Sequence, residues 1–297
     1  MNNRILLLVV ILLSIIYVCL NSSSNTTFFT TSPNIKVKKE DNNIEYLDLE
    51  EYVIGVVAAE MPASFNEEAL KAQAVAARTY ATYKMKNSKS NYDVVTSVSN
   101  QRYITIEEMK NKWKNEFDKY YAKVVEAVKA TSGKIMFYND EVIEAYYFSM
   151  SNGYTETANT VFNENRDYLQ SVESNYDKNN KNFLVVKDFT KEEVCLKLDI
   201  PCSYLIFKDI VRSDTNRVNY ITVNNKVLKG TDFRHKLGLR STDFTIVTNG
   251  NVVSITTKGY GHGVGMSQYG ANGMAKEGYS YEEILKHFYK NIKISSI

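Results

Sequence analysis

The stretch from Glu68 to Tyr83 most constrains what this chain folds into. It reads Glu-Ala-Leu-Lys-Ala-Gln-Ala-Val-Ala-Ala-Arg-Thr-Tyr-Ala-Thr-Tyr. Alanine is the strongest helix former and its side chain is small, so the stretch predicts a helix of about five turns packed closely on several sides. Ser64 and Glu67 have the spacing of a capping box before it, and Asn66 is an alternative N-cap.

An acidic residue closes the apolar stretch that precedes this helix. Residues 51–60 read Glu-Tyr-Val-Ile-Gly-Val-Val-Ala-Ala-Glu, and Met61-Pro62 follow. Apolar residues recur at helical spacing from Tyr46 to Ala59, which predicts a second helix and hence a helical hairpin that carries Glu60. Desolvation at such a position disfavours the charged carboxylate. A carboxyl group that stays protonated near neutral pH suits cleavage of a glycosidic bond. The alternative is a glutamate at a helix end in water.

Lys71 and Arg78 lie seven residues apart and therefore share one face of the predicted helix. If that face lines a groove beside Glu60, both cations are placed for an anionic or polar substrate. The alternative is a solvated stripe.

The rest of the chain predicts an α+β fold with an inserted smaller α/β lobe at about 175–245. Residues 110–129 suggest a helix, 135–148 a hairpin that ends in the polar turn Ser149-Met-Ser151-Asn152-Gly, and 177–182 a surface excursion. Within the lobe we expect short helices at 191–198 and 233–239 and strands at 204–211 and 220–227. A last helix is expected at 279–289, opened by Ser280 and Glu283.

A glycine-rich segment near the C-terminus reads Gly259-Tyr-Gly-His262-Gly-Val-Gly-Met-Ser-Gln268-Tyr269-Gly-Ala271. It fits neither the dinucleotide fingerprint nor a phosphate loop. Its glycines allow close approach of the backbone. We predict that it lies beside Glu60, with His262 and Gln268 offering polar atoms and Tyr269 pinning the turn. A purely structural histidine is the alternative.

The N-terminus resembles a targeting segment. Residues 5–20 are apolar except for Ser14. As a helix they span about 24 Å, short of a hydrocarbon core of roughly 30 Å, so a signal peptide and a membrane anchor both remain open. Arg4 favours an inside N-terminus. We expect residues 1–21 to be an uncleaved single-pass anchor, residues 22–43 a flexible tether, and the domain at 44–297 to lie outside the cytoplasm.

Composition excludes several other classes. The net charge of +2 gives no case for a nucleic-acid partner. Three histidines without paired spacing predict no metal site. No Gly-x-Ser-x-Gly nucleophile elbow is present. Cys195 and Cys202 form either a small disulfide loop or two packed thiols. The 22 tyrosines suit both a core and a sugar-binding groove.

Five blocks together carry a family resemblance. They are residues 51–65, 69–80, 151–155, 233–244 and 259–271, within a match that runs in order from about 46 to 293. In these blocks the chain resembles the stage II sporulation protein D family, peptidoglycan lytic transglycosylases of endospore-forming bacteria.

The resemblance implies a function and a site. Glu60 falls on the family's catalytic acid, and Lys71 and Arg78 fall on its basic groove residues. The remaining substrate-binding residues expected from the two wall motifs are Ser149, Ser151, Asn152, His262, Gln268 and Tyr269. Some members bind zinc through a cysteine pair in the stretch matching residues 92–102, which here has no Cys or His, so no cofactor is expected.

The implied reaction uses one acid, because no second carboxylate stands out in the sequence. Glu60 would cleave the bond between N-acetylmuramic acid and N-acetylglucosamine and leave a 1,6-anhydro end. Implied partners are glycan strands freed of stem peptides, a peptidoglycan amidase and a membrane partner of the engulfment machinery. Two rival functions remain: a glycan-binding amidase enhancer that does not cut, and a structural component of that machinery.

Overall fold

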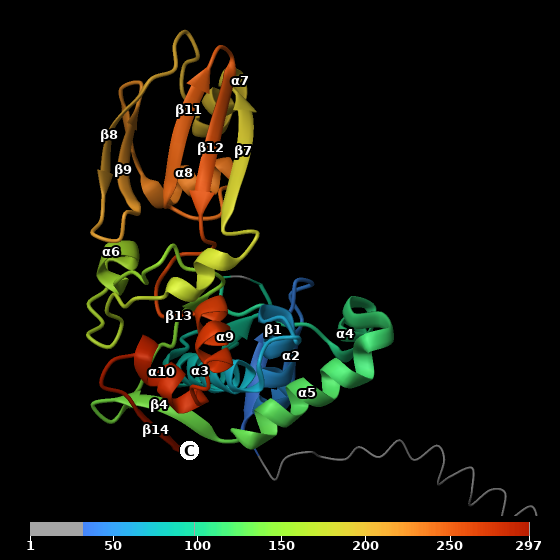
Figure 1. Cartoon of the computed structure of the whole chain (residues 1–297). Helices are drawn as coiled ribbons and strands as arrows, with labels where there is room; N and C mark the ends of the chain where they lie inside the picture. Colours follow the sequence, from blue (N-terminus) through green and yellow to red (C-terminus); the bar gives the residue numbers. More distant parts are fainter. Residues whose placement is uncertain (1–31, 98, 297) are drawn as a thin grey trace, which may run out of the picture. The chain divides into compact units, whose positions relative to one another are not determined.

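The alanine-rich stretch forms the central helix, α3 (Glu67–Asn87). The computed structural model describes residues 32–97 and 99–296. Asn66 caps α3 by accepting a hydrogen bond from the Glu68 amide, so the alternative N-cap is confirmed and the Ser64 capping box is wrong. The alanines are fully buried because four helices and one strand pack against α3 (Figure 1). These elements are α2 (Leu49–Glu60), α5 (Phe117–Ala130), α9 (Gln268–Lys276), α10 (Tyr281–Phe288) and β4 (Lys134–Tyr138).

The segment before α3 begins with strands. A three-stranded sheet has the order β2-β1-β3 and contains β1 (Asn34–Lys38), β2 (Ile44–Asp48) and β3 (Val94–Val95). Ile35 and Val37 alternate into the core, so the tether prediction is wrong for residues 34–38. Helix α2 (Leu49–Glu60) starts only after Asp48, whose side chain caps it. The helix predicted from Tyr46 therefore begins three residues too early.

The helix expected at 110–129 is divided in two. The elements are α4 (Ile106–Trp113), a 3₁₀ turn (Lys114–Glu116) and α5 (Phe117–Ala130). Lys114 has a φ of 49°, outside the helical region, which breaks the run. Thr105 and Glu108 form a capping box at the start of α4.

The predicted hairpin is only partly correct. Strand β4 (Lys134–Tyr138) pairs with β5 (Glu141–Val142) on one side and with β14 (Lys293–Ser296) on the other. The chain then leaves this sheet, and β6 (Tyr147–Phe148) pairs in parallel with β13 (Met266–Ser267). This pairing brings the Ser149–Gly153 turn next to the glycine-rich segment. The missed helix α9 (Gln268–Lys276) follows β13 directly, and α10 (Tyr281–Phe288) has the expected Ser280–Glu283 capping box.

The sheets of the inserted lobe run from residue 184 to residue 258, so they begin and end later in the chain than the expected range of about 175–245. It consists of two three-stranded sheets with orders β11-β12-β7 and β10-β9-β8 (Figure 1). A core of Phe189, Phe233, Phe244 and aliphatic residues lies between them. Cys195 and Cys202 form a disulfide. Its elements are β7 (Leu184–Thr190), α7 (Lys191–Leu198), β8 (Phe207–Arg212), β9 (Val218–Val223), β10 (Lys226–Lys229), α8 (Gly230–Leu237), β11 (Phe244–Asn249) and β12 (Val252–Lys258).

Two short elements precede the lobe in the chain, α6 (Ala158–Phe162) and a 3₁₀ turn (Asn175–Asn179). The anchor expected at 1–21 lies outside the described residues, as do residues 22–31 of the tether. Within the described part of the chain, no helix has the length and apolar character needed to cross a membrane.

Candidate active site around Glu60

Glu60 is the last residue of α2 and is half-buried. Its Oε1 accepts a hydrogen bond of 2.7 Å from the backbone N–H of Arg102. The end of the helix is also held by Lys112, whose Nζ lies 2.7 Å from the carbonyl oxygen of Ala58 and 3.3 Å from that of Ala59. Lys112 thus satisfies carbonyl groups that a helix terminus leaves without partners.

Burial raises the pKa of the Glu60 carboxyl group. The Arg102 backbone N–H, the Arg102 charge, the Gln268 amide and the Lys112 charge oppose this effect and do not cancel it. Among the described residues, no lysine or arginine forms an ion pair with Glu60. The raised pKa is the property a general acid needs.

Two tyrosines and a glutamine form a chain of hydrogen bonds beside this carboxyl group. The Tyr52 hydroxyl donates to Gln101 Oε1 over 3.3 Å, and Gln101 Nε2 donates to the Tyr147 hydroxyl over 3.1 Å. Burial raises the pKa of both tyrosines, and the nearby charge of Glu60 adds to it. Sequence reasoning missed these three residues because nothing in their spacing connects them.

The glycine-rich segment reaches Glu60 through Gln268. The Gln268 amide faces the Glu60 carboxyl group and also donates to Gln73 Oε1 over 3.3 Å. Gln73 is fully buried, and its Nε2 has no hydrogen-bond partner among the residues that the structure describes. Gln268 is therefore placed where the sequence predicted it. Tyr269 packs its ring edge-on against Phe65, with centroids 4.9 Å apart.

His262 contacts the neighbouring backbone instead. Its Nδ1 accepts from the Val264 amide over 3.1 Å, so Nε2 carries the proton and donates to the Tyr147 carbonyl over 3.0 Å. Burial lowers the pKa of His262 to about 3, aided by the charges of Arg234 and Arg217. The ring is thus a neutral brace for the strand that holds Tyr147, as in the structural alternative.

The Ser-Asn-Gly turn is a junction between the parts of the fold. Ser151 is fully buried and donates to Asp177 Oδ2 over 2.5 Å. Asp177 also accepts from Ser174 and Ser267, and burial raises its pKa to about 6. The surface position predicted for Asp177 is wrong, because three hydroxyl groups satisfy it inside the protein.

The neighbours of Ser151 serve the same junction. Asn152 donates to the Thr215 carbonyl and to Asp243 of the lobe, over 2.7 and 2.8 Å. The Ser149 carbonyl accepts from the Tyr269 amide over 3.1 Å. Their predicted contacts with substrate stay predictions.

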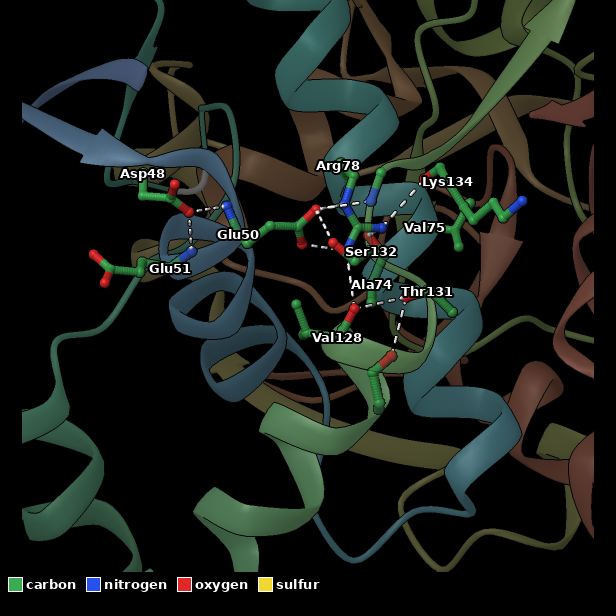
Figure 2. A network of polar contacts seen from close by, with 12 residues as sticks. Asp48, Glu50, Glu51, Ala74, Val75, Arg78, Val128, Thr131, Ser132 and Lys134 are labelled. Carbon is green, nitrogen blue, oxygen red and sulfur yellow. Dashed lines mark hydrogen bonds and ion pairs between the residues drawn. The ribbon is translucent and has the colours of Figure 1, made fainter. Parts of the chain in front are cut away.

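Arg78 is fully buried, so the prediction that its side chain lines a groove is wrong. Its Nε and Nη2 donate to the two carboxylate oxygens of Glu50 over 2.8 and 2.5 Å (Figure 2). The guanidinium also bonds to the carbonyls of Val128 and Lys134. Lys71 forms ion pairs with Glu67 and Glu68 in the first turn of α3, at 2.6 and 2.9 Å. The face that Lys71 and Arg78 share is therefore no common substrate surface.

A surface pocket of about 880 Å³ lies near the hydrogen-bonded chain of Tyr52, Gln101 and Tyr147. Tyr83, Lys84, Asn100 and Tyr146 are among its lining residues, and Glu60 is not. Asn100 and Tyr146 directly precede Gln101 and Tyr147, which lie beside Glu60. No group of three or more potential metal ligands occurs in the part of the chain that the structure describes.

Comparison with known proteins gives consistent matches. A family model described as Stage II sporulation protein matches residues 37–138, which include Glu60. The chain is 44% identical over 262 residues to Stage II sporulation protein D of Bacillus subtilis, covering 86% of this chain and 76% of that protein. It is 43% identical to Stage II sporulation protein D of Bacillus amyloliquefaciens, covering 87% and 77%. It is 28% identical to the Amidase enhancer of Bacillus subtilis, covering 82% of this chain and 40% of that protein.

Proposed function

The chain belongs to the stage II sporulation protein D family, and from this membership and the Glu60 site we propose that it is a peptidoglycan lytic transglycosylase of sporulation. The observation that supports the activity is the state of the Glu60 carboxyl group. Burial raises its pKa, and it forms no ion pair among the described residues. Because burial outweighs the opposing charges of Arg102 and Lys112, Glu60 holds its proton to higher pH than an exposed glutamate does.

The proposed reaction needs one residue in two roles. Protonated Glu60 donates to the oxygen between N-acetylmuramic acid and N-acetylglucosamine as the bond from C1 to that oxygen breaks. The carboxylate so formed takes the proton from the C6 hydroxyl of the same muramic acid, whose oxygen then bonds to C1. The product is a 1,6-anhydro end, and no water is consumed. A single group acting as acid and then base works best with a pKa near the operating pH.

The surrounding residues have positioning roles in this proposal. The Arg102 N–H fixes one carboxyl oxygen of Glu60, and the carboxyl group so held would donate its proton to the substrate. Gln268 and the Tyr52–Gln101–Tyr147 chain set the orientation of the site. The neighbouring pocket offers the aromatic faces of Tyr83 and Tyr146, which suit sugar rings, and we propose it as part of the substrate groove.

We further propose that the N-terminal segment anchors the protein in the cell membrane, with the domain outside the cytoplasm. Peptidoglycan strands would then be the substrate, and a peptidoglycan amidase and a membrane protein of the engulfment machinery would be partners. The similarity to an amidase enhancer supports a peptidoglycan-related partner.

The same similarity favours a second candidate function, a glycan-binding protein that stimulates an amidase without cutting. Mass spectrometry of glycan strands incubated with the protein separates the two. Anhydro-muramyl ends are expected from the wild type and absent with Glu60→Gln. Strands that stay uncut, together with faster release of stem peptides by an added amidase, would replace the transglycosylase proposal with the enhancer.

A further inference from the structure

A second pocket, of about 530 Å³, lies between α6 and the β9–β10–α8 part of the lobe. Figure 1 shows α6 next to the ends of β8 and β9. This volume is within the range of about 300–1,000 Å³ typical of small-molecule sites. Glu60 is not among its lining residues, which are Glu156, Asn159, Thr160, Val161, Phe162, Asn163, Arg217, Val218, Asn219, Tyr220, Lys229, Thr231 and Thr242.

A buried arginine, Arg217, is among the lining residues of this pocket. It is 2% exposed, and its Nη2 donates to the Tyr154 carbonyl over 3.1 Å. Its Nε is buried and has no hydrogen-bond partner among the described residues. The guanidinium lies flat against Gly263, where a Cβ would come within 2.6 Å of Nε. A side chain at position 263 would therefore displace the arginine, so the glycine makes room for it.

The nearby carboxylates are bonded to other groups. Charges of Glu156 and Asp243 act on Arg217. Glu156 accepts from the Thr157 amide and from the hydroxyls of Ser213 and Thr215, and Asp243 accepts from Asn152 and Asn216. In the described part of the chain Arg217 forms no ion pair. A buried guanidinium without an ion pair suits a carboxylate, which an arginine binds through its N–H groups.

The walls of the pocket offer ring faces and polar groups. Phe162 on α6 is 36% exposed and Tyr220 on β9 is 47% exposed. Lys229 adds a second positive charge, and Asn159, Asn163 and Asn219 add amide groups. Aromatic faces with neighbouring amides suit a sugar ring, while the arginine and lysine suit an acidic substituent.

We propose that this pocket is a second saccharide site, which binds a sugar that carries a carboxylate and places that carboxylate on Arg217. The muramic acid of peptidoglycan has such a group on its lactyl ether, so the identity of the ligand rests on the proposed function. The site itself rests only on the pocket, its arginine and its walls. Through this site the protein binds the glycan strand at a point separate from Glu60.

Binding of three probes to the full-length protein tests this proposal: N-acetylmuramic acid, N-acetylglucosamine and D-lactate. We expect N-acetylmuramic acid to bind at least tenfold more tightly than either of the others, measured by calorimetry or ligand-observed NMR. Equal binding of the two sugars would overturn the carboxylate assignment. Lactate binding as tight as that of the muramic acid would reduce the site to a simple anion site and overturn the saccharide assignment.

A matched pair of variants places the binding in this pocket. Thr231 lines it in the first turn of α8, where an acidic side chain is compatible with the helix. Thr231→Glu should weaken binding of N-acetylmuramic acid about tenfold through repulsion, and the uncharged Thr231→Gln should keep it within about twofold. Equal affinities in the two variants would show that the sugar binds elsewhere and would overturn the site.

Arg217→Gln is a second test of the site. If circular dichroism shows that this variant is folded, it should bind N-acetylmuramic acid no more tightly than N-acetylglucosamine. The Thr231 pair decides the question if that variant does not fold. These measurements involve no bond cleavage, so a chain that forms no anhydro ends would refute the proposed enzyme while the binding results still stand.

Discussion

Each end of helix α2 carries a glutamate, and the two glutamates have different surroundings. Glu50, in the first turn, is 2% exposed and meets both Nε and Nη2 of Arg78, with Ser132 and the Gly133 amide as further donors. Glu60, in the last turn, is half-buried and meets one backbone amide and the Gln268 amide; the charges of Arg102 and Lys112 act on it without forming an ion pair among the described residues. Burial alone therefore does not identify a reactive acid.

Glu50 and Glu60 differ in the groups that contact their carboxyl oxygens. The bidentate contact between Glu50 and Arg78 ties elements together, here α2, α3 and the α5–β4 turn. A carboxyl group that is desolvated without an ion pair keeps its proton more readily, which is the arrangement used for acid catalysis. The same helix thus supplies a fixed ion pair at one end and a proposed proton donor at the other.

The largest expected effect comes from Glu60→Gln. The change is nearly isosteric and removes the transferable proton, so cleavage of glycan strands should fall by about 10²- to 10⁴-fold while the fold is kept. Release of anhydro-muramyl ends measures the rate, and Glu51→Gln on the exposed side of the same helix is the matched control. Activity within about threefold of wild type would show that Glu60 is not the acid.

Changes to the Glu50–Arg78 pair should affect stability instead. Arg78→Met leaves the Glu50 carboxylate buried without its cation, which typically costs about 3–5 kcal/mol of unfolding free energy. Urea denaturation measures this loss, and activity per folded molecule should stay normal. The double change Glu50→Leu with Arg78→Met should be less destabilising than the single change. A stable Arg78→Met protein with poor cleavage would return Arg78 to a role in substrate binding.

The sequence was informative where local rules decide and failed where tertiary partners decide. The alanine-rich helix, the short helix at 191–198 and the position of Gln268 followed from spacing and motifs. The role of Arg78 did not, because its carboxylate partner lies 28 positions earlier in the chain and seven-residue spacing does not reveal which way a helix face points. The Tyr52–Gln101–Tyr147 chain was equally invisible, since three distant segments form it.

A smaller effect is expected in the pH dependence of stability. Because the pKa of Glu60 is raised on folding, the folded protein holds this proton over a pH range in which the unfolded chain has released it. Glu60 therefore favours the folded state less as the pH rises from its ordinary carboxyl range through the raised value. The difference in unfolding free energy between Glu60→Gln and wild type should shift in favour of the variant across that range. A difference that does not change with pH would contradict a raised pKa at this end of α2. Glycan cleavage by wild type should decline over the same range as the acid loses its proton.

The smallest expected effect concerns metal removal. If the pKa of Glu60 is set by burial and not by a bound metal ion, EDTA should leave the cleavage rate unchanged within about twofold. Purified protein should also hold no stoichiometric zinc. The described residues contain no group of three or more potential ligands, and Cys195 and Cys202 are joined to each other, so neither offers a thiolate. Elemental analysis with and without the chelator makes the measurement, and restoring activity with added zinc after EDTA would contradict it. One zinc per chain together with EDTA-sensitive cleavage would mean that a metal ion, and not burial, gives Glu60 the reactivity that Glu50 lacks.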